Sequence, residues 1–244
     1  MAKTESTSDD PIGLAKGQPS GGQDMDDSSP QRVVNAVVSG IQKGRFVPGQ
    51  RLIEVDLTRE LKISRGPVRE AFKRLAAEGV LVLNRHRGAY IRAQTREEVA
   101  DTLTVMEVLG GLAAKLAAQS IEKGDNRQRL KATYEGLMSQ GKQGETFAFL
   151  AERRRFYDTI YEIGGNQELQ RMIPRMQISL LRLQFQAYVT AEHHENQLKG
   201  LKAIAEAVLA GDEKRAERAC REHLRRRRRS MTSFPEESYA AAQR

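Results

Sequence analysis

The stretch SRGPVREAFKRL, from Ser64 to Leu75, decides the fold of the first third of the chain. Its serine stands where a helix N-cap belongs, and Pro67 falls in the first turn, where its missing N–H has no intrahelical acceptor to lose. At about 100° per residue, the charged and apolar side chains separate onto opposite sides of a helix. The sequence therefore predicts a helix to about Ala77 with one packed side and one polar, mostly basic side. The polar side holds Arg65, Gly66, Arg69, Glu70 and Lys73, and the packed side holds Val68, Ala71, Phe72 and Leu75.

The residues around this helix complete a small domain. Apolar residues recur at helical spacing from Gln31, and that helix should stop before the turn at Pro48 and Gly49; a short helix follows around 57–61. After Gly79 the pattern changes to two β runs, 80–83 and 89–91, around a basic turn with a glycine. Three helices and a basic hairpin predict a winged helix-turn-helix domain over residues 31–94.

Beyond Ala93 the sequence is almost wholly helical. The capping box of Thr95 and Glu98 predicts a long helix to about Glu122. Later breaks at 124–125, 144, 164–166, 190–191 and 211–212 give six helices, and Pro174 should kink the fourth. The predicted fold is therefore mainly α: the winged helix-turn-helix domain, then an all-α helical bundle over 95–232. A disordered tail at 1–30 and a C-terminal tail at 233–244 flank the two domains.

Composition and charge narrow the class of protein. The chain has 244 residues, 39% of them apolar, which is enough for two domains. No long apolar run or N-terminal apolar segment is present, so we expect neither a membrane span nor a secretory signal, and a cytoplasmic location. The net charge is +8, and residues 31–95 hold thirteen Lys or Arg against five Asp or Glu. This concentration of positive charge favours an anionic partner.

The basic helix is suited to DNA. A helix fits the major groove, where Arg offers two parallel donors to guanine, and other cations neutralise phosphates. Arg65 and Arg69 lie one turn apart at the helix start, the end that a helix-turn-helix presents to bases. Arg85, His86 and Arg87 at the hairpin tip could reach the minor groove or the backbone, with Gly88 letting the strand approach closely.

The run from Pro48 to Ile91 resembles the DNA-binding domain of GntR-family bacterial transcription regulators. The shared motif residues are Pro48, Gly49, Arg51, Leu52, Glu54, Ser64 to Ala71 without position 66, Leu75, Glu78, Gly79, Arg87 and Gly88. Position 66 is commonly Thr in that family, so Gly66 removes a possible phosphate-contacting hydroxyl. The candidate DNA contacts are Arg51, Ser64, Arg65, Gly66, Arg69, Lys73, Arg85, His86, Arg87 and Gly88.

The second half resembles the all-helical, FCD-like effector domain of the FadR-type branch of that family, which implies that 95–232 is a ligand-binding and dimerisation domain. The similar residues are Ala113 to Ala118, Arg155-Phe156, Ile163 to Asn166, Ala203-Ile204, Gly211-Asp212, Ala216 and His223-Leu224. Many members of this branch bind a divalent metal through D-x-x-[FL]-H and two further histidines. The resemblance places Arg153, Tyr157 and Leu201 where three ligands would stand and retains only His223.

A guanidinium cannot coordinate a cation and repels it, so we expect no metal, the alternative being a regulator that retains a divalent site. His193 and His194 should lie at a solvated helix start, and His194 is about 10 Å along the helix from Leu201, too far to substitute.

The same positions suggest an organic anion instead. Arg153 and Tyr157 are at i and i+4, on one face, where a buried guanidinium beside a phenol could grip a carboxylate or phosphate. The alternative is that Arg153 joins Arg154 and Arg155 outside the bundle. Met106 and Gly110, which replace Arg and Glu common in this branch, also indicate altered ligand chemistry. The candidate ligand residues are Met106, Gly110, Arg153, Tyr157, Leu201 and His223.

These patterns predict a DNA-binding transcription regulator, not an enzyme, because no catalytic motif is present. One recognition helix covers only a half-site, so we expect a homodimer on a palindromic operator, controlled by an organic-acid effector and using no cofactor. The family resemblance favours a repressor. A non-specific DNA-compacting protein is the alternative. The run Arg225 to Arg229 is expected to end the last helix, in preference to contacting phosphate.

Overall fold

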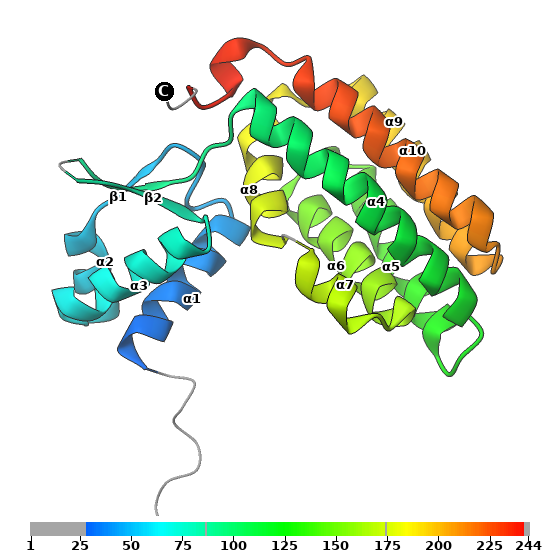
Figure 1. Cartoon of the computed structure of the whole chain (residues 1–244), viewed down its shortest axis with the longest axis horizontal. Helices are drawn as coiled ribbons and strands as arrows, with labels where there is room; N and C mark the ends of the chain where they lie inside the picture. The colour runs from blue at the N-terminus through cyan, green and yellow to red at the C-terminus, as the bar shows by residue number, and fades with distance from the viewer. Residues whose placement is uncertain (1–27, 86, 174, 242–244) are drawn as a thin grey trace, which may run out of the picture.

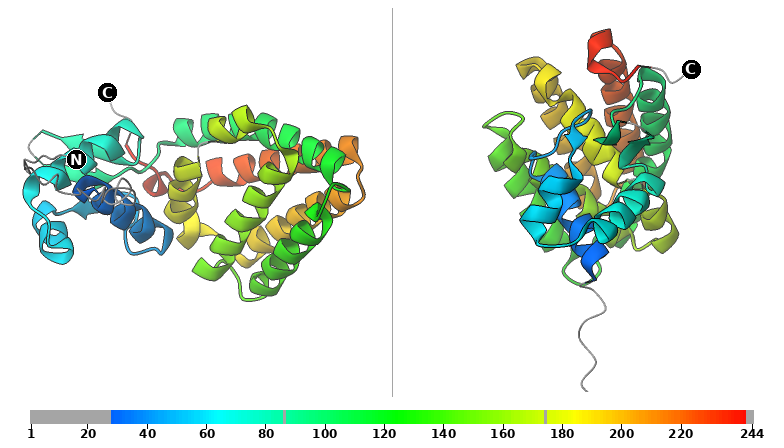
Figure 2. Two further views of the ribbon diagram at one scale, coloured as in Figure 1. Left: turned by 90° about the horizontal axis from the view of Figure 1, so that it is seen from below. Right: turned by 90° about the vertical axis from the view of Figure 1, so that its left-hand side faces the viewer.

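The computed structural model describes residues 28–85, 87–173 and 175–241. Most of the predicted disordered tail, together with His86 and Pro174, lies outside these residues. The described chain forms two packed units, a small domain with a sheet and a larger helical domain, side by side along the long axis (Figures 1 and 2). This arrangement confirms the predicted fold class.

The first domain is a winged helix-turn-helix. It contains α1 (Ser29–Gln42), β1 (Arg51–Leu52), α2 (Glu54–Leu61), α3 (Arg65–Ala77), β2 (Leu81–Asn84) and β3 (Gly88–Ile91). The strands form an antiparallel sheet in the order β1-β3-β2, with Leu83 opposite Ala89. Helix α1 starts two residues before the predicted Gln31, because Pro30 fits its first turn. The two-residue β1, which was not predicted, pairs with β3.

The apolar side of α3 is buried as its pattern predicts. The core of this domain contains Val33, Val37, Ile41, Phe46, Leu57, Val68, Phe72, Leu75, Val80, Leu81 and Ile91. Val68 and Leu75 have no exposed surface, so α3 is fixed against α1. Packing of one side of α3 leaves its other side for solvent or a partner.

The second domain is a bundle of seven α-helices within the described residues. They are α4 (Arg96–Ser120), α5 (Asn126–Gly141), α6 (Phe147–Gly164), α7 (Gln167–Met172), α8 (Arg175–Phe185), α9 (Ala191–Leu209) and α10 (Glu213–Thr232), with short 3-10 turns at Gln186–Tyr188 and Glu236–Ser238. Thr95 and Glu98 form the predicted capping box. Helix α4 lies along α10 through most of its length (Figure 1).

The prediction of one kinked helix around Pro174 was wrong. Two helices, α7 and α8, stand there, and Ile173 between them is extended at ψ 118°. A residue that precedes proline avoids the α region, because the proline ring collides with its backbone. The chain therefore leaves the helical conformation at Ile173, and α8 takes a direction of its own.

The segment after α10, assigned to a tail from the sequence, packs at the junction of the two domains. Phe234 and Tyr239 are buried in a cluster with Phe185. The backbone N–H of Ala240 donates to the carbonyl of Gln94, which lies in the linker between the domains. The C-terminal end thus returns to the start of α4 (Figure 1).

Candidate nucleic-acid interface and effector cavity

Helix α3 presents its basic residues to solvent. Arg65, Arg69 and Lys73 are exposed, while Val68 and Phe72 on the opposite side are buried. The Nε of Arg69 donates to Oε2 of Glu54 at 3.0 Å, which ties α3 to the start of α2. Ser64 occupies the N-cap position without a side-chain capping bond, so its exposed hydroxyl remains available to another acceptor or donor.

The hairpin adds a second group of cations. Arg85 and Arg87 are exposed, and Gly88 has φ +90°, a conformation that side-chain-bearing residues rarely adopt. A Cβ at Gly88 would lie 3.5 Å from Nε of Arg51, so Arg51 lies against the base of the hairpin. The start of α3 and the hairpin tip both lie at the end of the domain farthest from the bundle (Figure 1).

All described DNA candidates are exposed. They are Arg51, Ser64, Arg65, Gly66, Arg69, Lys73, Arg85, Arg87 and Gly88. His86 lies outside the described residues. A Cβ at Gly66 would meet nothing within 4 Å, so the side chain missing at this position leaves open space beside the start of α3. The exposed set can reach a flat or grooved anionic surface.

In the helical domain, Arg153 points into the bundle. Only 1% of its surface is exposed, so the alternative in which it joins Arg154 and Arg155 outside does not hold. Its Nη1 donates to Oε1 of Glu145 at 3.0 Å and to Oε1 of Gln197, and its guanidinium lies 5.3 Å from the ring centroid of Phe149. A buried ion pair of this kind is costly to break because it would leave a charge without compensation.

Arg153 lines a small, partly enclosed cavity of about 30 Å³, which has room for a water molecule. Of the predicted ligand residues, Met106, Tyr157 and His223 line the same cavity. Gly110 does not, because it packs against Leu224 and Cys220, and Leu201 is fully buried in the apolar core. Four of the six predicted residues therefore meet at one place, and two do not.

The cavity also gathers residues that the sequence analysis missed. Arg182 from α8, Arg227 from α10 and Gln197 from α9 line it, and Glu145 pairs with Arg153 from the loop before α6. The Nη1 of Arg227 donates to Gln197, whose Nε2 donates to Oε2 of Glu145 at 2.8 Å. Arg227 could have been found from the sequence, because it stands at i+4 from His223 and so shares its face.

His194 corrects a prediction. We expected a solvated helix start, but only 8% of its surface is exposed. Its Nδ1 lies 3.1 Å from Oε2 of Glu145 and its Nε2 lies 2.7 Å from the carbonyl oxygen of Gly141. His194, the fourth residue of α9, points toward α5 and the ring of Phe149 and lies beside Glu145.

Positive charge dominates the cavity. Burial raises the pKa of Glu145, but Arg153 and Arg227 outweigh this and hold the pKa at about 2. Burial and then Arg227 and Arg153 lower the pKa of His223 to about 3, so its imidazole is neutral at physiological pH. Burial and then Arg153 lower the pKa of Arg182 to about 10 and that of Arg227 to about 9. Three guanidinium groups thus face a single carboxylate.

Several donors at the cavity have no acceptor within the described part of the chain. They are Nε and Nη2 of Arg153 and the hydroxyl of Tyr157. Burial raises the pKa of Tyr157 well above its usual range, so the phenol stays protonated and can donate. Buried donors normally have acceptors, and those without one mark a place where a ligand can bind.

A larger groove adjoins the cavity. It lies between α9 and α10, has a volume of about 580 Å³, and shares Gln197, His223 and Arg227 with the cavity. Its other walls include apolar residues such as Ala203 and Phe234. The cationic cluster therefore forms the inner end of a space large enough for a small organic molecule.

Comparison with known families matches both domains. Residues 30–91 match the bacterial regulatory proteins of the gntR family, and residues 101–226, just over half of the chain, match the FCD domain. The chain belongs to the GntR family. As a GntR regulator with an FCD domain it is a DNA-binding transcription regulator and not an enzyme.

Relatives of this GntR protein are regulators. The probable D-xylose utilization operon transcriptional repressor of Paenarthrobacter nicotinovorans is 26% identical over 199 residues, which cover 79% of this chain and 84% of the relative. The Nta operon transcriptional regulator of Aminobacter aminovorans is 30% identical over 130 residues, covering 52% and 60%. The transcriptional repressor RspR of Escherichia coli (strain K12) is 23% identical over 194 residues, covering 79% and 84%.

Solved structures of other GntR-type proteins share the fold. A putative GntR regulator from Rhodococcus sp. RHA1 has a TM-score of 0.72 at 21% identity, covering 86% of this chain and 100% of that one. McbR/YncC of E. coli has a TM-score of 0.71 at 20% identity, covering 84% and 97%. In the described part of this GntR chain, no helix is both long and apolar enough to cross a membrane.

The residues of the FCD cavity do not fit a divalent metal. Arg153 places a guanidinium where the resemblance puts a carboxylate ligand, and Tyr157 and Leu201 replace two histidines. Among the residues with described positions, no three His, Cys, Asp or Glu side chains gather in a way that could hold a metal ion. Glu145 and His194 bond to each other and to neighbouring groups.

The run Arg225 to Arg229 of this GntR regulator lies in the last turns of α10, which ends at Thr232. Its members act separately. Arg225 donates to Oε1 of Glu107 on α4 at 2.6 Å, Arg226 pairs with Glu222, and Arg227 lines the cavity. The run therefore joins α10 to α4 and supplies one residue to the cavity, in addition to its favourable position at the helix end. Five identical residues give no sign in the sequence of which arginine takes which role.

Proposed function

We propose that this GntR regulator binds a two-fold DNA operator in a sequence-specific way, and that a small organic anion in the FCD cavity controls this binding. We infer that it acts as a repressor in the cytoplasm, where its DNA is. One observation carries the effector proposal: three guanidinium groups, from the buried Arg153 and the partly buried Arg182 and Arg227, face one carboxylate.

DNA recognition rests on α3 and the hairpin. The buried side of α3 fixes the direction in which Arg65 and Arg69 project. We assign Arg65, at the helix start, to a base edge in the major groove, and Lys73 to phosphate. Arg69 is held in place by the bond that its Nε donates to Oε2 of Glu54. Arg85 and Arg87 on the hairpin contact the neighbouring backbone or minor groove.

The effector completes the charge balance of the cavity. A carboxylate between Arg153 and Arg227 accepts hydrogen bonds from the unpartnered Nη2 of Arg153 and the hydroxyl of Tyr157. Charge-assisted bonds of this kind are the strong ones. The cavity itself holds only about 30 Å³, so the body of the effector lies in the adjoining groove between α9 and α10. Binding in this form uses no metal.

A homodimer is supported by a stripe on α4. Residues on the outer face of this helix recur at alternating intervals of four and three, which is the spacing of a coiled-coil seam. The stripe consists of Asp101, Val105, Val108, Leu112, Lys115 and Gln119. Val105, Val108 and Leu112 are 53%, 51% and 39% exposed. In an antiparallel pair, Val108 meets Leu112 of the partner subunit, and both copies bury the same patch, as two-fold symmetry requires.

Helix α8 offers a path from effector to DNA. Leu180 is fully buried in the core of the DNA-binding domain, and Arg182, two residues later, lines the cavity. An anion that draws Arg182 inward moves Leu180 with it, because both stand on one rigid turn. The DNA-binding domain then has two positions relative to the FCD domain, and the effector shifts the balance between them only as far as its affinities for the two positions differ.

A screen of organic acids by thermal shift tests the effector proposal, since a ligand that prefers the folded state raises the melting temperature. The acid that stabilises the protein should also release DNA. Tyr157→Phe removes one donor without removing charge and should reduce both effects, and Arg153→Ala should abolish them. Arg218→Ala, on the exposed side of α10, is the control and should leave them unchanged.

Three outcomes would contradict the proposal. An unchanged titration in Arg153→Ala would refute the role of this residue. A large stabilisation by zinc or nickel that a chelator reverses would show a metal site. Loss of DNA binding under excess unrelated DNA at physiological salt would favour a compacting protein over a sequence-specific regulator.

A further inference from the structure

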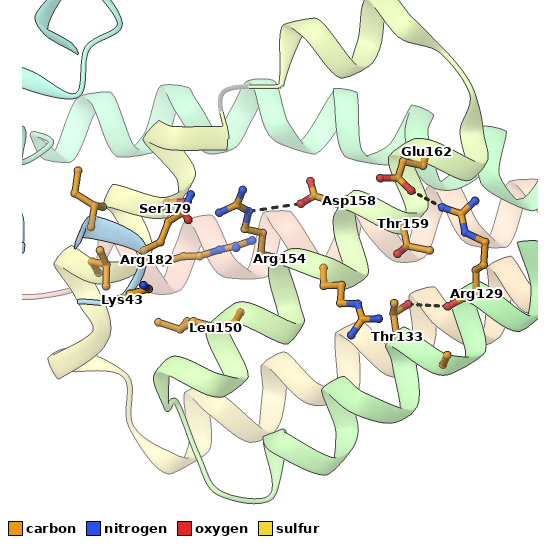
Figure 3. A pocket seen from close by; sticks show the side chains of 16 residues that line it. Lys43, Arg129, Thr133, Leu150, Arg154, Asp158, Thr159, Glu162, Ser179 and Arg182 are labelled. Atoms are coloured by element: carbon orange, nitrogen blue, oxygen red, sulfur yellow. Dashed lines mark hydrogen bonds and ion pairs between the residues drawn. The ribbon is translucent and has the colours of Figure 1, made fainter. Parts of the chain in front are cut away.

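A second and larger space lies between the two domains. It has a volume of about 770 Å³, within the range of small-molecule sites, and is separate from the groove between α9 and α10. The end of α1 in the DNA-binding domain forms one wall, and α5, α6 and α8 of the FCD domain form the others (Figure 3). We call this space the interdomain cleft.

Basic side chains outnumber acidic ones in the interdomain cleft. The cations are Lys43, Arg129, Arg154, Arg155 and Arg182, and the acids are Asp158 and Glu162. Figure 3 shows Arg182 extending toward Arg154, with Lys43 on the same side of the cleft and the pair of Arg129 and Glu162 at its other end. The walls thus carry an excess of positive charge.

The ion pairs leave two of these cations without a carboxylate. Arg129 pairs with Glu162, Arg154 lies 3.5 Å from Asp158, and Arg155 lies 3.8 Å from Glu152. Within the ranges that the structure covers, neither Lys43 nor Arg182 makes an ion pair or a side-chain hydrogen bond, and Arg182 has only the ring of Tyr157, 5.9 Å away. These two residues come from different domains.

We propose that the interdomain cleft is a second ligand site, for a small molecule with two acidic groups, either carboxylates or phosphates. One acidic group binds Arg182 and Arg154, and the other binds Lys43. A dianion suits the cleft better than a monoanion because the two uncompensated cations, Lys43 and Arg182, come from different domains and each can hold one acidic group. Leu150 and Leu183 give the cleft an apolar part for a short carbon body.

Occupation of the cleft has a mechanical consequence. Lys43 follows α1 directly, and Ile41 of that helix is fully buried in the core of the DNA-binding domain. A ligand that bridges Lys43 and Arg182 therefore ties the DNA-binding domain to α8. Arg182 also lines the effector cavity, so an anion in the cleft and an anion in the cavity compete for one guanidinium and weaken each other by the same factor.

Isothermal titration of the full chain with citrate and, separately, with inorganic pyrophosphate tests this site. We expect at least one of the two to bind, and the one preferred distinguishes carboxylate from phosphate chemistry. Lys43→Ala should weaken that binding about tenfold, the loss expected for one charge-assisted contact. Arg45→Ala removes a charge from the same segment without lining the cleft, and it should bind as the wild type does.

A further variant separates this site from the effector cavity. Tyr157→Phe should retain binding in the cleft while losing part of the response to the effector acid, and Lys43→Ala should show the reverse. Failure of both citrate and pyrophosphate to bind would overturn the proposal. So would equal affinities for Lys43→Ala and Arg45→Ala, or binding that Tyr157→Phe abolishes and Lys43→Ala does not. None of these results depends on whether the cavity binds an organic acid.

Discussion

Replacement of His223 by Gln should remove a large part of the acid sensitivity of the protein. The pKa of His223 is lowered from 6.5 to about 3 in the folded chain, by burial first and then by Arg227 and Arg153. The unfolded chain takes up a proton on this imidazole below pH 6.5, and the folded chain does not until about pH 3. Stability from this group is therefore fully present above pH 6.5 and is lost as the pH falls.

The size of the effect follows from the pKa difference. Each pH unit below the pKa of the unfolded chain lowers the free energy of unfolding by about 1.4 kcal/mol. His223 alone therefore lowers this free energy by about 2 kcal/mol between pH 7.5 and pH 5. His223→Gln lacks the titrating group. Its free energy of unfolding should therefore fall less than that of the wild type over this interval, and the difference should be the amount given for His223. Glu145, whose pKa is held at about 2, adds its loss only at lower pH, below about 4.5.

Urea unfolding followed by circular dichroism at the two pH values measures the difference. His193→Gln is the control, because it removes one imidazole from the start of α9, which is only partly buried. An equal loss of stability in the wild type and in His223→Gln would show that His223 is protonated in the folded protein.

Three further substitutions test the packing. In Gly40→Ala the new Cβ would overlap the ring of Phe46, so the melting temperature of the DNA-binding domain should fall, at a cost of about 1–3 kcal/mol. In Gly200→Ala the new Cβ would overlap the ring of His223 and push it into the cavity, so calorimetry should show lost effector binding; retained affinity would place the effector elsewhere. Val108→Asp should convert the dimer to a monomer in analytical ultracentrifugation and weaken operator binding, whereas Val55→Asp, an exposed valine on α2, should leave the dimer intact; a dimeric Val108→Asp would exclude the α4 stripe as the interface.

Short-range patterns were sufficient for the DNA-binding domain. The N-cap serine, the first-turn proline and the spacing of Val68, Phe72 and Leu75 act within one helix, so they predict α3 from the residue after Ser64 to about Ala77, which agrees with its bounds. Strand β1 escaped prediction because two residues carry no periodicity, and it is formed by pairing with β3. The break at Ile173 was predicted as a kink in one helix, because a proline in a helical pattern can either kink the helix or end it.

The cavity was predictable only in part, for a physical reason. The family resemblance pointed to Arg153 and Tyr157, and their i and i+4 spacing places both on one face of α6. Glu145, Gln197 and Arg182 come from a loop and two other helices, and only the packing of the bundle brings them together. The spacing of these residues along the chain does not indicate that they lie close together in the fold. Gly110 and Leu201, which do not line the cavity, were placed by the family resemblance alone.

Binding-site selection from a randomised DNA duplex, in excess unrelated competitor, tests recognition through α3 most directly. The wild type and Arg218→Ala should enrich the same inverted repeat. Arg65→Ala should bind that repeat more weakly, by about 1–3 kcal/mol of binding free energy. It should also lose the preference for one particular base pair in each half-site. If Arg65→Ala selects the same sequence with the same affinity as Arg218→Ala, the start of α3 does not read DNA.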